Sequence, residues 1–526
     1  MSDPRFGHIS QAPTRPSEGP REPFDVASLY DGVAGSADPG GESSVGLEEK
    51  LRQAYFWVTN TAIISPYYDI EYNDAPPSSY AFGDSKTRVT LPTDQSYSSY
   101  VLLPLLNLAV CRRCLLVGGP GRGKTAIAIL LGVLAGYNLK EIRRGIQHGQ
   151  PQMTIADLLG NPLPSTLVHA ESMDDVTIAW RKWLGMRVKI IDEYNRIPTR
   201  TQSALLTVMG DNYAELYDQV YECPEAAWYL TANDDAGGGT YQVIEALRDR
   251  IDVVVKALHF NTRFFGDLVT RVEEGINPAE VVPEEIRFTA DQLATVRRQI
   301  RAVPFPRPLR RRLEFFASHF EFFEPGARRM EYMTKDTVKL AAIDWHHFAG
   351  EDTGRDRLID IGSQTHNGLS VRAMMTAILF VKGMAYFRGS PEVEFEDLRQ
   401  MLPFVLHDKL VQNEDSPFFE ESGNGALRAD KVSWIRNLFD SSCQEYERLN
   451  LDRDDPVGEF EAEFKKGLEG LDERTVRRRL AAIERTLENW SSGRKLYGHL
   501  FDDVLKLKYL HQRYTNYLRW LQWKSR

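Results

Sequence analysis

The chain has few cysteines, no long hydrophobic run and no excess of positive charge. Only 4 of its 526 residues are cysteine, too few for a disulfide framework, so we expect a reducing compartment. No apolar stretch reaches the ~18 residues that cross a bilayer, and no hydrophobic leader follows the first methionine. These absences argue against a secreted or membrane-spanning protein and predict a cytoplasmic one.

Charge is unevenly distributed along a chain of ordinary globular composition. The net charge of −10 gives no general reason to expect binding to nucleic acid or to an anionic membrane. Residues 471–526, however, hold 13 Lys and Arg against 6 Asp and Glu, a net +7 that leaves −17 on the remainder. A basic end on an acidic body predicts a specific contact surface there.

The order of apolar runs predicts four segments. Residues 1–45 contain 19 Pro, Gly and Ser residues without apolar periodicity, so we expect a disordered arm. Over 46–260, short apolar runs alternate with helical patterns, which predicts an α/β core around a parallel sheet. Helical patterns dominate 261–412 and 413–526, which predicts a helical domain and then a helical extension. Within the extension, helices are expected at 431–449, 475–490 and 496–523.

The strongest motif is the run GGPGRGKT at 118–125. It matches G-x-x-x-x-G-K-[ST], follows an apolar run at 114–117 and precedes a helical pattern at 126–135. In that setting glycines let the backbone fold around phosphates, and the start of the helix adds its positive dipole. Lys124 is expected at the β- and γ-phosphates of ATP and Thr125 at Mg²⁺. The residues predicted to bind the nucleotide are Gly119, Pro120, Gly121, Arg122, Gly123, Lys124, Thr125 and Ala126.

A pair of acids follows about sixty residues later. The apolar run at 188–191 ends in Asp192 and Glu193, which a strand would deliver to the edge of the sheet where the phosphates lie. Asp192 is expected to hold Mg²⁺ through water, and Glu193 to orient and polarise the attacking water. Because such a glutamate serves hydrolysis, its presence argues against binding alone.

An ordered series of further motifs resembles the MoxR branch of the AAA+ ATPases. The acid pair opens the run DEYNRIP, and TQSALL follows it at 201–206. The run IADLLG at 155–160 resembles the segment where this branch carries its helix-2 insert. Three later runs stand in the same order as in the family, YLTAN at the sensor-1 strand, EALRDR at the arginine finger and GLSVR at the sensor-2 helix. The resemblance covers roughly residues 100–410.

This resemblance implies roles for individual side chains. Asn233 would sit beside the attacking water, and Arg372 would reach the γ-phosphate from an α-helical lid at 261–412. Arg250 would contact the nucleotide of a neighbouring subunit, with Arg248 as the alternative, because a guanidinium stabilises charge on the transferred phosphoryl group. Since the finger comes from the next subunit, the active form would be a ring, and the family implies a hexamer.

The resemblance also implies a function. It predicts Mg²⁺-dependent ATP hydrolysis that drives chaperone-like remodelling or assembly of a protein, commonly one with a von Willebrand factor A domain. Two alternatives are a motor that acts on nucleic acid or in defence, and a scaffold whose assembly ATP switches. For the basic extension at 413–526, the alternatives are a self-packed bundle, a docking site for an acidic protein, and a nucleic-acid contact.

Overall fold

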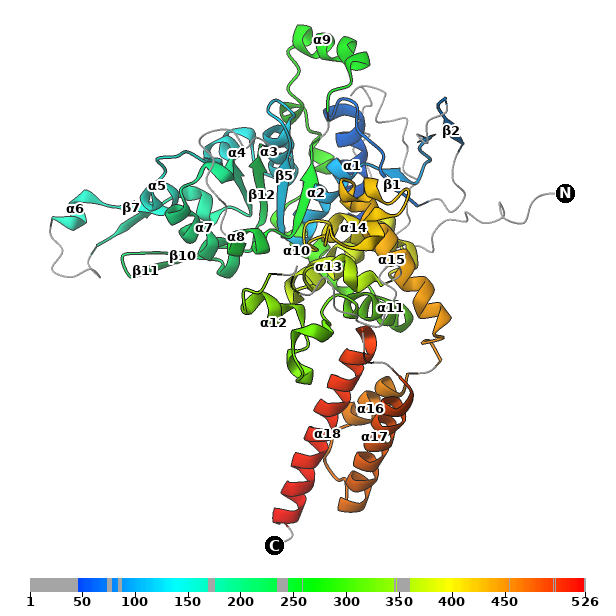
Figure 1. Ribbon diagram of the computed structural model, residues 1–526. Helices are drawn as coiled ribbons and strands as arrows, with labels where there is room; N and C mark the ends of the chain where they lie inside the picture. Colours follow the sequence, from blue (N-terminus) through cyan, green and yellow to red (C-terminus); the bar gives the residue numbers. More distant parts are fainter. Residues whose placement is uncertain are drawn as a thin grey trace. The chain divides into compact units, whose positions relative to one another are not determined.

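The computed structural model describes residues 46–72, 78–83, 88–168, 176–233, 245–257, 259–344, 347, 360–453, 455–494, 496 and 498–524. Within these ranges, the side chains of Leu167, Glu245, Ala246 and Arg248 are not described, and the predicted arm at 1–45 lies outside them. The chain divides into two compact units (Figure 1). The first comprises residues 1–305 and 372–406, and the second comprises 306–371 and 407–526.

The first unit is built on a parallel sheet. Its five strands have the order β13-β5-β12-β9-β6, so that the strands next to each other in space are not consecutive in the chain. The apolar runs predicted at 114–117 and 188–191 form β5 and β9, and the predicted α/β parallel sheet is confirmed. The strands are β5 (Arg113–Val117), β6 (Gln147–His148), β9 (Val188–Asp192), β12 (Ala227–Ala232) and β13 (Val253–Lys256).

Helices cover both faces of this sheet. On one face, the amide of Asn107 donates to the Trp228 carbonyl at 3.1 Å, and the Tyr229 hydroxyl donates to the Pro104 carbonyl at 2.8 Å. These bonds fix α2 against β12. On the other face, α7 and α8 contribute Leu205 and Leu247 to an apolar core shared with the strands. The helices are α1 (Leu47–Trp57), α2 (Ser99–Val110), α3 (Lys124–Leu134), α4 (Leu139–Gly145), α7 (Thr199–Asp211), α8 (Glu245–Arg250), α9 (Phe265–Glu274), α10 (Ala290–Ala302), α13 (Val371–Arg388) and α14 (Phe395–Leu406).

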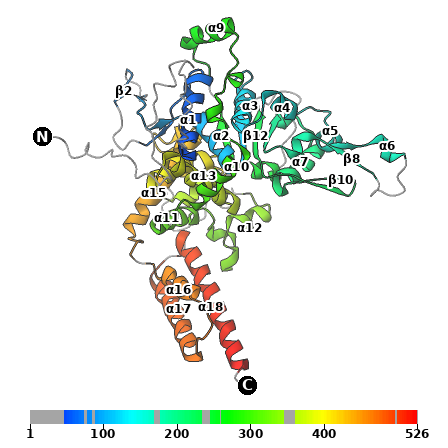
Figure 2. The ribbon, with the colours of Figure 1, turned by 180° about the vertical axis from the view of Figure 1, so that it is seen from behind.

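Two antiparallel hairpins extend side by side from one edge of the first unit, seen from opposite sides in Figures 1 and 2. The rings of Trp180 and Tyr221, one from each hairpin, have centroids 5.6 Å apart. The first hairpin, with its two short helices, is formed by α5 (Ile155–Leu159), β7 (Gly160–Pro162), α6 (Pro164–Leu167) and β8 (Ile178–Trp180), and the second by β10 (Tyr213–Leu216) and β11 (Gln219–Glu222). Before α2, short pairs join β1 (Ile70–Glu71) to β4 (Ser96–Tyr97) and β2 (Ser79–Ala81) to β3 (Arg88–Thr90).

The second unit is helical. The long helices predicted at 475–490 and 496–523 are α17 and α18, which pack with α16 around a core that includes Val476, Ile483 and Leu507. Its helices are α11 (Arg307–Ser318), α12 (Lys335–Leu340), α15 (Lys431–Arg448), α16 (Pro456–Lys465), α17 (Glu473–Gly493) and α18 (Gly498–Lys524). None of the helices in the described ranges combines the length and apolar character of a membrane span.

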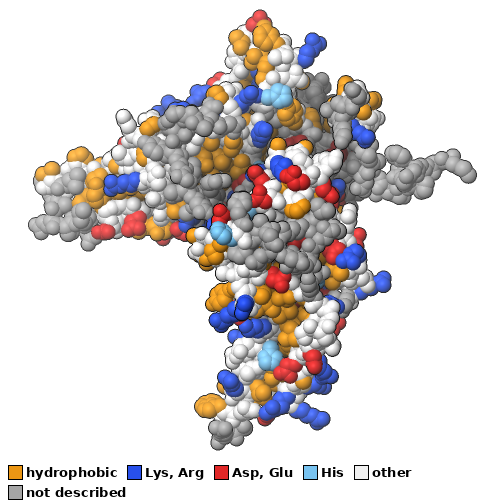
Figure 3. Space-filling model, viewed as in Figure 1, with side chains coloured by type: hydrophobic (Ala, Val, Ile, Leu, Met, Phe, Trp, Pro, Cys, Tyr) orange, Lys and Arg blue, Asp and Glu red, His pale blue; other side chains and the backbone are white. Residues whose placement is uncertain are grey.

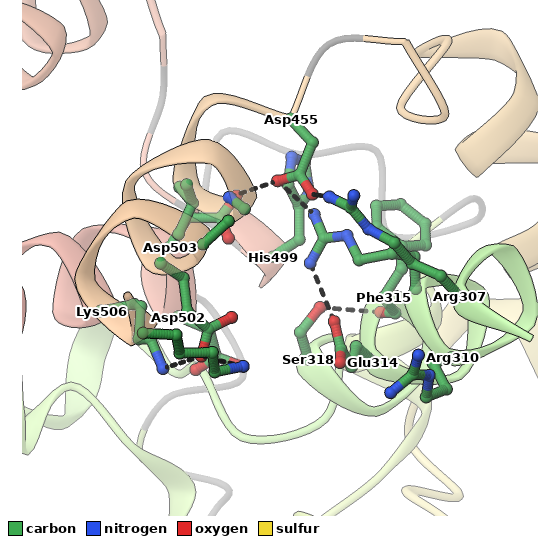
Figure 4. A pocket seen from close by; sticks show the side chains of 16 residues that line it. Arg307, Arg310, Glu314, Phe315, Ser318, Asp455, His499, Asp502, Asp503 and Lys506 are labelled. Carbon is green, nitrogen blue, oxygen red and sulfur yellow. Dashed lines mark hydrogen bonds and ion pairs between the residues drawn. The ribbon is translucent and has the colours of Figure 1, made fainter. Parts of the chain in front are cut away.

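A charged cavity of about 540 Å³ lies among α11, α16 and α18 of the second unit (Figure 4). The guanidinium of Arg311 lies 3.3 Å from the carboxylate of Asp455, which Arg307 also contacts. Asp502 and Asp503 line the same cavity, and no ion pair to either is formed among the residues that the structure describes. Burial, which disfavours the charged carboxylate, raises the pKa of each to about 6.

Replacement of Asp503 by Asn should stabilise the second unit at pH 7.5 and change little near pH 4. The pKa of Asp503 is higher in the folded state, at about 6, than in an unfolded chain, at about 3.9, so the folded state binds the proton more tightly. Wild-type stability therefore falls as the pH rises through this window, whereas an amide has no such dependence. In tryptophan-detected thermal unfolding, the midpoint of Asp503→Asn should exceed that of the wild type at pH 7.5, and the gap should close on acidification.

The matched control for this titration is Glu488→Gln, which removes a carboxylate from the exposed face of α17. Its unfolding midpoint should follow that of the wild type across the same pH range. A gap for Asp503→Asn that widens on acidification would contradict the assignment of a buried, destabilising carboxylate.

Candidate active site

The glycine-rich loop lies between β5 and α3, with Lys124 as the first residue of the helix. Gly121 and Gly123 have φ angles of 72° and 73°, in the left-handed region that favours glycine. At Gly118 a Cβ atom would lie 2.9 Å from that of Ala257, the residue after β13. The loop thus turns closely against the sheet and presents its backbone at the N-terminus of α3, a geometry suited to phosphate.

Lys124 connects this loop to the end of β12. Its buried ammonium donates to the Gly119 carbonyl at 2.8 Å and to Oδ1 of Asn233 at 2.9 Å. A further bond reaches the Gly118 carbonyl. The residue predicted to hold phosphates and the residue predicted to lie beside the attacking water are therefore in direct contact.

The two residues predicted at the metal are also in contact. The Thr125 hydroxyl donates to Oδ1 of Asp192 at 2.6 Å. On the other flank, Nδ1 of His148 at the exposed end of β6 lies 3.3 Å from Oδ2 of Asp192. One hydroxyl and one carboxylate are oxygen ligands of the kind that Mg²⁺ takes when substrate phosphates and water complete its shell.

Thr231 is a functional residue that the sequence interpretation missed. Its hydroxyl donates to Oδ1 of Asp192 at 2.7 Å and accepts the backbone N–H of Glu193 at 2.9 Å. Glu193 has a φ of 53°, uncommon for a residue with a side chain, and the bond to Thr231 holds it there. The available signal was a hydroxyl at a buried position of an otherwise apolar strand.

Glu193 is oriented at its side chain as well as at its backbone. Asn233 donates through Nδ2 to Oε1 of Glu193 at 3.2 Å, and Arg196 lies 3.2 Å from Oε2. Lys124, Asn233 and Glu193 thus form a continuous hydrogen-bonded path from the loop to the carboxylate. Such a path fixes the direction in which Glu193 faces.

An apolar cavity of about 480 Å³ adjoins the glycine-rich loop. Ile63, Ile64, Leu130 and Leu268 line it, and its wall includes loop residues. The guanidinium of Arg271 on α9 donates to the carbonyls of Thr61 and Ala62, at 2.6 and 2.9 Å, and so ties α9 to this wall. The cavity has the size and character of a site for a nucleotide base.

The three arginines predicted to act on the nucleotide lie away from the glycine-rich loop or outside the described side chains. Arg250 ends α8, its guanidinium lies 4.0 Å from Asp211, and 20% of its side chain is exposed. Arg372 forms an ion pair with Asp249 of α8. For Arg248, also on α8, the side chain lies outside the described part. No contact between the described arginines and the glycine-rich loop is formed, so their roles stay predictions.

Two segments of the chain match known protein families. Residues 113–253 match the family described as "ATPase family associated with various cellular activities (AAA)", and residues 360–428 match the AAA lid domain. Chaperone MoxR1 of Mycobacterium tuberculosis is 24% identical over 309 residues, which is 57% of this chain and 68% of that protein. A crystal structure of a protein from Cytophaga hutchinsonii is 19% identical, with a TM-score of 0.44 over 64% of this chain and 89% of that one. The two matched segments therefore resemble an AAA ATPase domain and its lid, and the similarity to the chaperone relative agrees with the resemblance to the MoxR-type AAA+ ATPases.

Proposed function

We propose that this chain hydrolyses ATP with Mg²⁺, and that it does so as a homo-hexameric ring that remodels or assembles a partner protein. The path from Lys124 through Asn233 to Glu193 carries the proposal. It sets a cation, an amide and a carboxylate in one line at the phosphate-binding loop. A site built only to hold a nucleotide would not need the oriented carboxylate.

Each of these residues has a distinct task in the proposed reaction. ATP would supply the transferable phosphoryl group, and Mg²⁺ would neutralise part of the charge on it. Lys124 holds the phosphates, while Thr125 and Asp192 hold the ion. Glu193 orients a water molecule and withdraws its proton, with Asn233 fixing the carboxylate and keeping the water in line. Thr231 keeps the two acids in register, because one hydroxyl bonds both.

We propose a ring because Arg250 or Arg248 would act on the nucleotide of the neighbouring subunit. A guanidinium from the next subunit would stabilise the charge that develops on the phosphoryl group, at the position that the family assigns to its arginine finger. Asp249, on the same short helix as these two arginines, forms an ion pair with Arg372 of α13. We propose that Arg372 leaves this pair when it engages the γ-phosphate.

Arg250→Ala is expected to reduce ATP hydrolysis by roughly 10³-fold and to be rescued in mixed rings. A subunit with Lys124→Ala binds ATP too weakly to hydrolyse it but keeps its Arg250, so it can complete the site of an Arg250→Ala neighbour. Phosphate release from a mixture of the two inactive variants should therefore exceed that from either alone. The Arg248→Ala variant, mixed in the same way, identifies which arginine acts, and absence of rescue with both would contradict action in trans.

The client is proposed to be a protein. The relative named Chaperone MoxR1 supports this class of client, and the resemblance supports a partner with a von Willebrand factor A domain. A cytoplasmic location is part of the proposal, and four free, buried thiols are what such a compartment preserves. The four predicted segments, with their boundaries at 45, 260 and 412, are likewise kept as proposals.

A further inference from the structure

Helix α18 presents a second line of side chains besides the one that packs in the core of its own bundle. This second line touches the bundle only at its beginning, where Tyr509 and Arg513 lie against the ring of Phe464 on α16. The packed line includes Leu507, Leu510 and Tyr514, all buried in the core with α16 and α17. A second line recurs at alternating intervals of four and three residues, the spacing of a coiled-coil seam. At about 100° per residue it lies roughly 120° around the helix from the packed line. We call it the outer seam, and it consists of Tyr509, Arg513, Asn516, Trp520 and Trp523.

The aromatic members of the outer seam are exposed. Tyr509 is 51% exposed, Trp520 45% and Trp523 73%. Figure 3 shows apolar side chains at the surface of the lower end of the molecule, with basic and acidic ones beside them. A tryptophan on the surface forfeits a large hydrophobic contribution, and tryptophan and arginine are the side chains most enriched at the centres of protein interfaces. The outer seam therefore has the composition of a contact that is completed by another molecule.

Charge beside the outer seam is of one sign. After Asp503, α18 contains no further Asp or Glu, and its cations lie on both flanks of the seam. Lys506 and Lys508 have partners in Glu461 and Glu331. The remaining cations are Arg513, Arg519 and Lys524, and no ion pair to them is formed within the described ranges of the chain.

These charges decide between the occupants of the surface. A second copy of α18 would bring cation against cation along both flanks, which is unfavourable in a coiled coil. Stacking of nucleic-acid bases is also disfavoured, because the ring of Trp520 already stacks on Tyr517 at 5.4 Å and lies 5.2 Å from the ammonium of Lys524. An acidic protein helix would cover the exposed aromatic rings and supply carboxylates to Arg513, Arg519 and Lys524, which have no acidic partner in the described part of the chain.

We propose that the outer seam docks an amphipathic helix of a partner protein, one with an apolar seam flanked by Asp and Glu. The seam from Tyr509 to Trp523 spans about 21 Å, which matches a partner helix of about four turns. Arg513 and Asn516, at seam positions, would fix the register of the pair, as polar seam residues do in coiled coils. This docking belongs to the second unit and does not depend on ATP hydrolysis.

The test uses the full chain and a fluorescein-labelled synthetic helix about three heptads long, with Leu at seam positions and Glu at the flanks. A second peptide replaces every Glu by Lys, and a third probe is single-stranded oligo-dT. Fluorescence anisotropy should show binding of the Glu peptide, weakened by added salt, and none of the Lys peptide. The double variant Trp520→Ala/Trp523→Ala should weaken binding by about tenfold or more.

Charge reversal provides the matched control. Arg519→Glu, beside the outer seam, should weaken binding several-fold, whereas Arg485→Glu, an exposed arginine on α17, should leave it unchanged. Both positions are on the surface, so circular dichroism should show the same fold. Equal binding by the wild type and the Trp520→Ala/Trp523→Ala variant would overturn the proposal. So would tighter binding of oligo-dT that depends on these tryptophans, or loss of self-association in the same variant.

To identify the natural partner, a photo-crosslinking amino acid is incorporated at position 523 of the full chain in the native host. Mass spectrometry of the crosslinked peptide should find an acidic amphipathic helix of another protein. Crosslinks that fall within copies of this chain, or on segments without such a helix, contradict the proposal.

Discussion

Lys124→Ala is expected to weaken ATP binding by more than about 100-fold, a loss of about 2.7 kcal/mol. The ammonium of Lys124 is buried in the glycine-rich loop, in contact with a loop carbonyl. Without it, the triphosphate would meet the loop and the carboxylate of Asp192 with much less compensating charge. Isothermal titration with ATP and Mg²⁺ measures the loss directly.

The matched control is Lys140→Ala, which removes an exposed lysine from α4 in the same unit. Its affinity for ATP should equal that of the wild type. A wild-type affinity for Lys124→Ala would refute the assignment of the loop as the phosphate site. Thermal unfolding serves as the fold check, because Lys124 also bonds Asn233 and its loss removes that contact.

Much of the sheet could be predicted from the sequence, for a physical reason. A parallel strand buried on both faces reads as a short apolar run, and β5, β9 and β12 are largely such runs, although β9 also contains the buried Lys189. The glycine-rich loop, Asp192 and Glu193 follow directly from these strands. Their proximity needs no tertiary information beyond the rule that parallel strands end at one edge.

The apolar cavity beside the glycine-rich loop could not be predicted, because its wall is assembled from distant parts of the chain. Ile63 and Leu268 are separated by more than half of the first unit's sequence, and Arg271 joins them through backbone carbonyls. No periodicity reports such a contact. Thr231 was missed for a related reason, since a threonine in a strand is ordinary until its two acidic neighbours are seen.

The raised pKa of Asp503 likewise depends on packing that no local pattern reveals. The Asp502 and Asp503 pair in the sequence is typical of a solvated helix end, whereas the structure places both in the charged cavity beside α11 and α16 and leaves Asp503 half-buried. Unlike the pKa of Asp503, the spacing of the outer seam can be read directly from the sequence. What the structure added is that Leu507, Leu510 and Tyr514 already use the other line, which leaves Trp520 and Trp523 exposed.

Glu193→Gln is expected to reduce ATP hydrolysis by about 10²- to 10³-fold and to leave ATP affinity within about threefold of the wild type. Glutamine has nearly the same shape and keeps an oxygen that accepts from Asn233, so the arrangement of the site should persist. It cannot withdraw a proton from water, and it no longer carries the charge that Arg196 contacts. Phosphate release and ATP titration, measured on one preparation, separate these effects.

The control for this substitution is Glu215→Gln, on the exposed face of β10, which should hydrolyse ATP at the wild-type rate. Phosphate release by Glu193→Gln at that same rate would remove Glu193 from its proposed task. The variant also distinguishes remodelling driven by ATP hydrolysis from a scaffold switched by ATP binding, because it should bind ATP without consuming it. If it holds its client and releases none, hydrolysis drives remodelling. If it supports the full function in ATP, binding alone is the switch, and the oriented carboxylate of Glu193 then serves only to reset the ring.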